Sequence, residues 1–161
     1  MPNTKKTILG ISPGTNTMGI ALIKGNQLID WRIKVFDKNW SHEKLDKIIN
    51  VLHQIIIKHN VSVLAIKVVH PNRSSDGLNQ LISAITSLSK SKEVTLFICS
   101  VWDVKTHCLK DGKTNDEKVV EYVFQKYPEL HREYQKEINS KNPYYVKGFE
   151  AIAIAHMFKG E

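Results

Sequence analysis

The sequence predicts an α/β domain built on a five-stranded mixed sheet with helices on both faces, in the order βββαβαβ followed by C-terminal helices. Three strand patterns follow one another between residues 7 and 36. Two further apolar strands then alternate with amphipathic helices up to residue 99, and the last third of the chain has helical periodicity. No repeat, low-complexity segment or Pro/Gly/Ser-rich linker divides the chain, so we expect one domain over residues 1–161.

The first three strands are expected to be antiparallel. Residues 7–11 and 18–23 are short apolar runs on either side of the turn sequence PGTNT. Residues 27–36 alternate apolar and polar side chains with a period of two, which predicts one buried face. The residues expected on that buried face are Ile29, Trp31, Ile33 and Val35.

A helix, a strand and a second helix are predicted next. Ser41 is a candidate N-cap for a helix whose apolar residues recur every three or four positions up to residue 60. Residues 61–69 form a nearly continuous apolar run, typical of a strand covered on both faces, and Lys67 interrupts it. Asp76 is the expected cap of the second helix, with leucines and isoleucines facing inward.

The remaining elements are a fifth strand over residues 94–99 and a helical last third. Thr114 and Glu117 form a candidate capping box, and Pro128 is expected to stop the helix that it opens. The last helix includes residues 149–156, and its alanines allow close packing on a sheet.

The charge of the chain favours a polyanionic partner such as nucleic acid. The formal net charge is +7, and the excess lies in residues 1–100, which hold 13 basic and 6 acidic residues, whereas residues 101–161 hold ten of each. Cys99 and Cys108 have no Cys/His metal-binding spacing and are typical of a reduced protein. With no targeting segment and no membrane-spanning run visible, we expect a cytoplasmic protein without a membrane partner.

Four stretches, in order along the chain, carry a resemblance to a known family. They read ILGISPGTNTMGIALI, VLAIKVVHPNRSSDGLNQL, VWDVKTHCLKDGKTNDEKVVEYVF and KGFEAIAIAHMF. They resemble, in this order, four stretches of the RuvC family of Holliday junction resolvases. The first two are the family's first strand with its turn, and its fourth strand with the following loop and helix. The last two are the stretch from a Val-Lys to an Ala-Glu-Lys helix start, and the ending Asp-Ala-Ala-Asp-Ala-Leu-Ala-Ile-Ala. The resemblance implies a ribonuclease H-like fold.

The resemblance also implies a reaction, hydrolysis of a phosphodiester at a four-way DNA junction by four carboxylates that hold two Mg²⁺ ions. At the matching positions this sequence has Ser12, Lys67, Lys147 and Glu150. These four side chains sum to +1, where four carboxylates carry about −4. We therefore expect no metal site, no Mg²⁺ cofactor and no two-metal cleavage, with lysine ammonium groups as countercharges to Glu150.

Other positions are candidate nucleic-acid contacts. By the resemblance, His70 takes the place of an aromatic wedge in the loop after the fourth strand, and Arg73 follows it. Lys105 and Lys118 match family positions near the phosphate backbone, and Lys113 lies between them. An ordinary polar loop and solvated lysines are the alternative interpretation. The other histidines show no metal-ligand spacing and are expected to be surface or core residues.

Three hypotheses on function remain open. The first is a RuvC-like protein that has lost two-metal endonuclease activity and retains binding to branched or structured DNA. The second is an active Mg-dependent crossover junction endodeoxyribonuclease that combines Glu150 with Asp76, Asp103 or Asp116. The third is a non-catalytic interaction or scaffold protein on the same fold. Members of the family work as two-fold dimers, which makes the helix from Asp76 a candidate homodimer contact.

Overall fold

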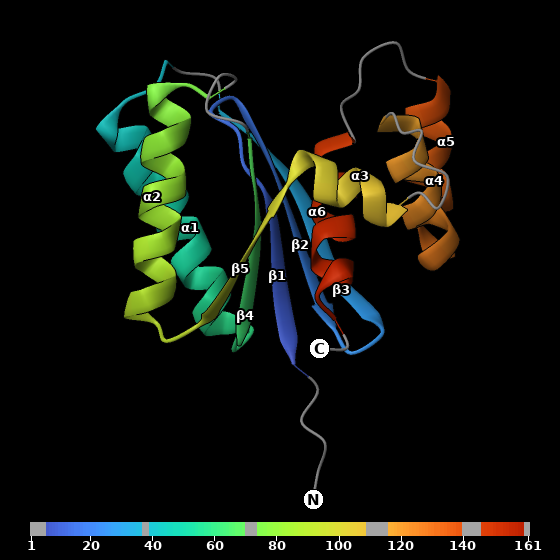
Figure 1. Cartoon of the computed structure of the whole chain (residues 1–161), viewed down its shortest axis with the longest axis horizontal. Helices are drawn as coiled ribbons and strands as arrows, with labels where there is room; N and C mark the ends of the chain where they lie inside the picture. The colour runs from blue at the N-terminus through green and yellow to red at the C-terminus, as the bar shows by residue number, and fades with distance from the viewer. Residues whose placement is uncertain (1–5, 37–38, 70–73, 109–115, 140–145, 160–161) are drawn as a thin grey trace, which may run out of the picture.

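A five-stranded sheet forms the centre of the molecule, and helices cover both of its faces (Figure 1). The structure is a computed structural model, and it describes residues 6–36, 39–69, 74–108, 116–139 and 146–159. The strands, in the spatial order β3-β2-β1-β4-β5, are β1 (Thr7–Ser12), β2 (Thr17–Lys24), β3 (Gln27–Val35), β4 (Val63–Val68) and β5 (Thr95–Ser100).

The sheet is mixed. β2 pairs antiparallel with both β1 and β3, whereas β4 pairs parallel with both β1 and β5. β1 therefore lies in the middle of the sheet, and all six of its residues are buried. The predicted α/β class and the predicted five-stranded mixed sheet are confirmed.

The helices form a core on each face of the sheet. On one face, α1 and α2 pack over apolar residues of the strands such as Leu9 and Ile66. On the other face, α6 lies directly on β1 and β2, and α3 and α4 pack beside it. The helices are α1 (His42–Lys58), α2 (Asp76–Ser91), α3 (Val101–Cys108), α4 (Asp116–Lys126), the 3₁₀ turn η2 (Pro128–Leu130), α5 (His131–Asn139) and α6 (Val146–Met157). No helix in the described ranges is long and apolar enough to cross a membrane.

Serine side chains cap the two helices on the first face. The Ser41 hydroxyl accepts a hydrogen bond from the backbone N–H of Lys44 at 3.1 Å, which confirms the predicted cap of α1. At α2 the predicted cap was wrong by one residue, because Ser75 and not Asp76 accepts the backbone N–H of Leu78, at 3.2 Å. Asp76 is instead the first helical residue, where its negative charge is favourable next to the helix N-terminus.

A β-bulge changes the face that β3 presents to the core. Leu22 of β2 pairs with Asp30 and Ile23 pairs with Leu28, so Ile29 is an extra residue on β3. The strict alternation predicted from the sequence was therefore wrong at this point. Leu28 and Trp31 pack against the same core, whereas Ile29 is 43% exposed. Val35, also expected inside, is 52% exposed at the end of the strand.

A reciprocal pair of hydrogen bonds begins α3. The Ser100 hydroxyl accepts the backbone N–H of Asp103 at 3.0 Å, and the Asp103 carboxylate accepts the backbone N–H of Ser100 at 2.9 Å. This is a capping box, and it turns the chain directly from β5 into a helix. The predicted capping box at Thr114 lies outside the described residues, while α4 ends at Lys126, before Pro128 as expected.

α6 packs against the sheet at very short range, as its alanines predict. A Cβ placed on Gly10 of β1 would lie 2.4 Å from the Ala151 carbonyl oxygen, and one placed on Gly19 of β2 would lie 2.0 Å from that of Lys147. On the helix, a Cβ on Gly148 would lie 2.6 Å from the ring of Trp31. Only glycine fits at these positions, and the close approach brings the first turns of α6 against the end of β1.

Candidate functional site

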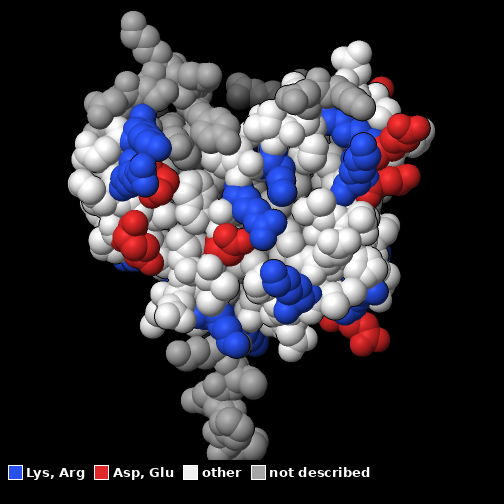
Figure 2. Space-filling view, turned by 180° about the vertical axis from the view of Figure 1, so that it is seen from behind, with Lys and Arg blue, Asp and Glu red and all other residues white. Residues whose placement is uncertain are grey.

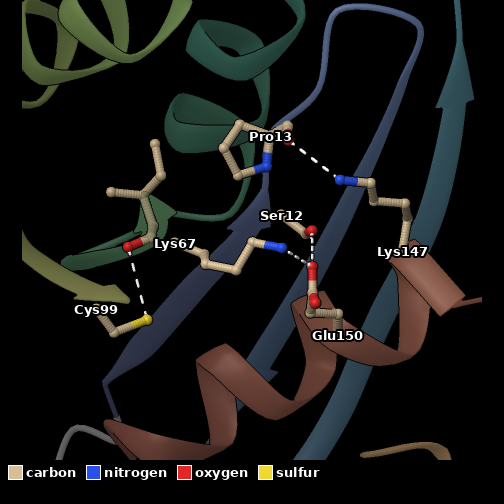
Figure 3. A network of polar contacts seen from close by, with 7 residues as sticks. Ser12, Pro13, Lys67, Cys99, Lys147 and Glu150 are labelled. Carbon is tan, nitrogen blue, oxygen red and sulfur yellow. Dashed lines mark hydrogen bonds and ion pairs between the residues drawn. The ribbon is translucent and has the colours of Figure 1, made fainter. Parts of the chain in front are cut away.

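The four residues that the resemblance places at the family's acidic positions meet at one end of the sheet (Figure 3). Ser12 ends β1 and Lys67 is the next-to-last residue of β4, and because these strands run parallel, both side chains lie at the same edge. Glu150 comes from α6, and Lys147 lies one helical turn before it. The structure therefore brings these four positions together in one cluster.

Glu150 is the centre of this cluster. Its Oε1 atom accepts hydrogen bonds from the Ser12 hydroxyl and from the Lys67 ammonium, and the latter contact is also an ion pair (Figure 3). The three residues are between 0 and 8% exposed, so this pair of opposite charges is shielded from water. Lys147 is partly exposed, and its Nζ donates to the carbonyl oxygen of Pro13 at 3.3 Å.

The surroundings keep Glu150 ionised. Burial raises the pKa of its carboxyl, but the charge and hydrogen bond of Lys67, the hydrogen bond of Ser12 and the charge of Lys147 outweigh burial and hold that pKa below its ordinary value of 4.5. The carboxylate is therefore negative at neutral pH, and the Lys67 ammonium supplies its countercharge.

The two Mg²⁺ ions that the resemblance implies do not fit these residues. Hard dications need several anionic oxygen ligands, and this cluster offers the carboxylate of Glu150 next to two ammonium groups. Across the part of the chain that the structure describes, no three His, Cys, Asp or Glu residues are grouped so that they could hold a metal ion.

The substitute acids considered from the sequence have other positions or lie outside the description. Asp103 uses its carboxylate in the capping box of α3. Asp76 is exposed in the first turn of α2. Asp116 begins α4, and its side chain is not among those described.

Cys99 lies beside the cluster but is a poor nucleophile. It pairs with Lys67 in the register of β4 and β5, and its Sγ atom donates to the Ile66 carbonyl oxygen at 3.7 Å. Burial, followed by the negative charge of Asp103, raises the pKa of this thiol to about 12. Because the thiolate is the reactive form, the thiol is inert at neutral pH.

The candidate nucleic-acid contacts lie mostly outside the description. His70, Arg73 and Lys113 fall on residues that the structure does not describe. Lys105 is in α3 and Lys118 is in α4, and for both only the backbone is described. All five stay predictions.

Two features were not predicted from the sequence: the exposed side chain of Trp102, and the contact between His107 and His156. Trp102 is 65% exposed in the first turn of α3, and the Ser-x-x-Asp pattern at residues 100–103 was the signal that a helix begins there. His107 and His156, expected to be scattered, face each other across the junction of α3 and α6 with ring centroids 6.4 Å apart. No signal in the sequence links two residues so far apart.

Tyrosines complete this histidine pair. Tyr122 Oη lies 3.0 Å from His107 Nε2, and Tyr127 Oη lies 3.0 Å from His156 Nδ1. Burial, followed by the positive charges of Lys159, His107 and Lys126, lowers the pKa of His156 to about 4. His156 is therefore neutral at physiological pH. The Tyr122–His107 contact joins α4 to α3, and the Tyr127–His156 contact joins the residue after α4 to α6.

The surface charge is consistent with a polyanionic partner. Figure 2 shows one face of the molecule, with Lys and Arg side chains at its centre and on both sides and acidic side chains next to several of them. Arg32 Nε and Asp30 Oδ2 form an ion pair at 2.9 Å. On this face, the positive side chains are therefore spread out and partly compensated by acidic neighbours.

Comparisons with known proteins agree with the geometry. Residues 8–141 match the sequence model of the family described as crossover junction endodeoxyribonuclease RuvC. Among solved structures, T. thermophilus RuvC in complex with a Holliday junction substrate superposes with a TM-score of 0.73 at 16% identity, over 93% of this chain and 90% of that chain. A second Thermus thermophilus RuvC structure superposes with a TM-score of 0.73 at 14% identity, over 92% and 90%. No curated protein matches the sequence.

The family match covers β1 to α5, and α6 with Lys147 and Glu150 lies beyond it. The structural match covers nearly the whole chain with the same fold. The predicted resemblance to the RuvC family is confirmed by the family match over residues 8–141 and by the fold. The chain has the ribonuclease H-like fold and belongs to the family of crossover junction endodeoxyribonuclease RuvC.

Proposed function

We propose that this RuvC-family protein binds branched or structured DNA and does not cut it by two-metal hydrolysis. The observation that carries the proposal is the buried Lys67–Glu150 ion pair at the carboxyl ends of β1 and β4. Two-metal cleavage needs several carboxylates around a pair of dications, and here the carboxylate present already accepts hydrogen bonds from Lys67 and Ser12.

The charge of the site supports binding without cleavage. Ser12, Lys67, Lys147 and Glu150 carry one net positive charge, which repels Mg²⁺ and attracts a phosphate group. Lys147 is the partly exposed member of the cluster, so it is the one that can reach a phosphate oxygen. The relative solved with a ligand holds a Holliday junction substrate, and a four-way junction is therefore the first DNA to test. Binding of such DNA implies a role in recombination or repair.

The first test is cleavage. A labelled synthetic four-way junction is incubated with the protein and Mg²⁺ or Mn²⁺, and the strands are separated on a denaturing gel. We expect the strands to stay intact. Specific nicking that Glu150→Gln abolishes would overturn the loss of activity and favour the substitute carboxylates.

The second test is binding, measured by gel shift on junction and on duplex over a range of salt concentrations. We expect tighter binding to the junction, and we expect Lys147→Ala to lower the slope of log affinity against log salt by about 1. Lys58→Ala is the matched control, because Lys58 is exposed at the end of α1, away from the carboxyl ends of β1 and β4. Equal affinity for duplex would remove junction recognition, and no affinity for either DNA would favour a scaffold role.

We also propose that the protein forms a two-fold dimer through α2. The exposed side of α2 and the start of α1 line a groove of about 450 Å³, and small side chains there, such as Ser83, Ala84 and Ser87, allow a second helix to approach closely. Light scattering should give twice the chain mass of 18.4 kDa. Ser83→Arg should return the mass to that of a monomer, and a monomeric wild type contradicts the dimer.

A further inference from the structure

We propose that Trp102 is a stacking platform for an unpaired nucleobase of the bound DNA. This inference rests on the proposed DNA binding and names the feature of the DNA that the protein recognises. It starts from an anomaly of burial, because Trp102 is 65% exposed although tryptophan is one of the most extensively buried residue types.

The exposure of Trp102 is fixed by the local structure. The residue lies between the two partners of the capping box, Ser100 and Asp103, whose reciprocal hydrogen bonds of 2.9 and 3.0 Å set the first turn of α3. Val104 and Cys108 form the buried side of the same helix. The helix therefore turns its apolar side inward and holds the indole ring outward, which is the arrangement of a preorganised contact.

The ring lies at the functional end of the sheet. Cys99 pairs with Lys67 and Ser100 pairs with Val68, so the start of α3 follows directly on the strand pair that carries the charged cluster. Asp103 of this first turn is close enough to Cys99 for its charge to raise the pKa of the thiol, together with burial. In Figure 1, α3 and α6 begin at the same end of the sheet.

The chemistry of the ring and the charge of the molecule point to a nucleobase as its occupant. Every base offers a π face, and stacking on an aromatic side chain contributes without sequence preference. Branched DNA exposes such faces where strands exchange, whereas a continuous duplex keeps its bases stacked on each other. The formal net charge of +7 favours a polyanion over an ordinary protein surface as the partner.

The test compares Trp102→Ala and Trp102→Phe with the wild type. Affinities for a labelled four-way junction, for duplex and for a single strand are measured by fluorescence anisotropy, and stacking is followed by 2-aminopurine placed next to the crossover. Ile57→Ala is the matched control, since Ile57 is 61% exposed near the end of α1.

We expect Trp102→Ala to weaken junction binding about 5- to 150-fold and to abolish the 2-aminopurine response. Trp102→Phe should retain part of both, and duplex affinity, melting temperature and the Ile57→Ala protein should be unchanged. Junction binding that is equally tight without Trp102, or an equal loss on junction and duplex, overturns the stacking while DNA binding itself stands. A wild type that binds none of the three DNAs overturns both, and then the exposed ring belongs to a protein contact.

Discussion

At the scale of single residues, Lys67 and Glu150 stabilise the fold only as a pair. Lys67→Met leaves a buried carboxylate without its countercharge, and we expect a loss of about 3–5 kcal/mol in the free energy of unfolding. The double variant Lys67→Met with Glu150→Leu removes both charges and should regain most of that loss. Urea denaturation at pH 7 measures the wild type, Lys67→Met, Glu150→Leu and the double variant, and additive losses would contradict a coupled ion pair.

Stability should fall in acid through two residues that act in the same direction. The pKa of Glu150 is lowered in the folded protein. Its contribution to the free energy of unfolding is therefore complete above pH 4.5 and is lost as the pH falls through that lowered pKa. His156 is held neutral in the fold with a pKa of about 4, so the unfolded chain binds more protons between pH 6.5 and 4, and stability decreases over that window as the pH falls.

The variant His156→Gln separates the two contributions. It keeps a hydrogen-bond acceptor for Tyr127 but does not titrate, and it should flatten the decrease between pH 6.5 and 4 by on the order of 1–2 kcal/mol, after allowance for solvent screening of a partly exposed ring. Below pH 4.5 the loss through Glu150 should remain. Urea midpoints at half-unit steps of pH measure this, and parallel curves for wild type and variant would contradict it.

At the scale of elements, local patterns predicted most of the structure because strand and helix periodicity and serine caps depend on short stretches of sequence. The bulge at Ile29 was missed because it depends on the register between β2 and β3. The contact of His107 with His156 was missed because it depends on how α3 and α6 pack. A lysine countercharge to Glu150 was expected through the resemblance, whereas the choice of Lys67 and the hydrogen bond from Ser12 emerge only when α6 is placed on the sheet.

The close packing of α6 on the sheet predicts how a glycine substitution in β1 affects stability. Gly10→Ala places a Cβ against the backbone of Ala151, which is rigid, so α6 must shift, and we expect a loss of about 1–3 kcal/mol in the free energy of unfolding. Gly25→Ala is the control. Gly25 has a φ of 62° in the turn after β2, so this change costs about 1–2 kcal/mol through backbone strain but leaves α6 in place.

A readout of the charged cluster distinguishes these two glycines. If α6 moves, the contact of Glu150 with Ser12 and Lys67 loosens, and the Glu150 carboxyl should titrate closer to its ordinary value in Gly10→Ala but not in Gly25→Ala. Carbon-detected NMR titration of the glutamate carboxyl groups measures this. An unchanged Glu150 titration in Gly10→Ala would show that α6 keeps its place on the sheet, and it would contradict this prediction.

At the scale of the whole molecule, the net charge of +7 has two sources. By the resemblance, Lys67 and Lys147 stand where the family carries acids, and two such exchanges alone would raise the net charge by about four units. Lys67 is buried against Glu150 and contributes no contact surface for DNA. Because the Lys67–Glu150 pair is neutral, the remaining residues still carry the net charge of +7, and this is the charge available for the proposed DNA binding.

Restoring the acids should convert the ion-paired cluster into a metal-dependent one. The variant S12D/K67E/K147D places four carboxylates at one end of the sheet, and their mutual repulsion should lower stability until a dication binds. Adding Mg²⁺ at about 100 times its dissociation constant should then stabilise the variant by about 2.7 kcal/mol, while the wild type should not respond.

Lys147→Asp alone, which keeps the Lys67–Glu150 pair, is the folded control. Melting curves with and without Mg²⁺ measure the effect. A wild-type melting temperature that rises with Mg²⁺ as steeply as that of the four-acid variant would mean that the present residues already bind the ion, and the replacement of metal by ammonium would be wrong.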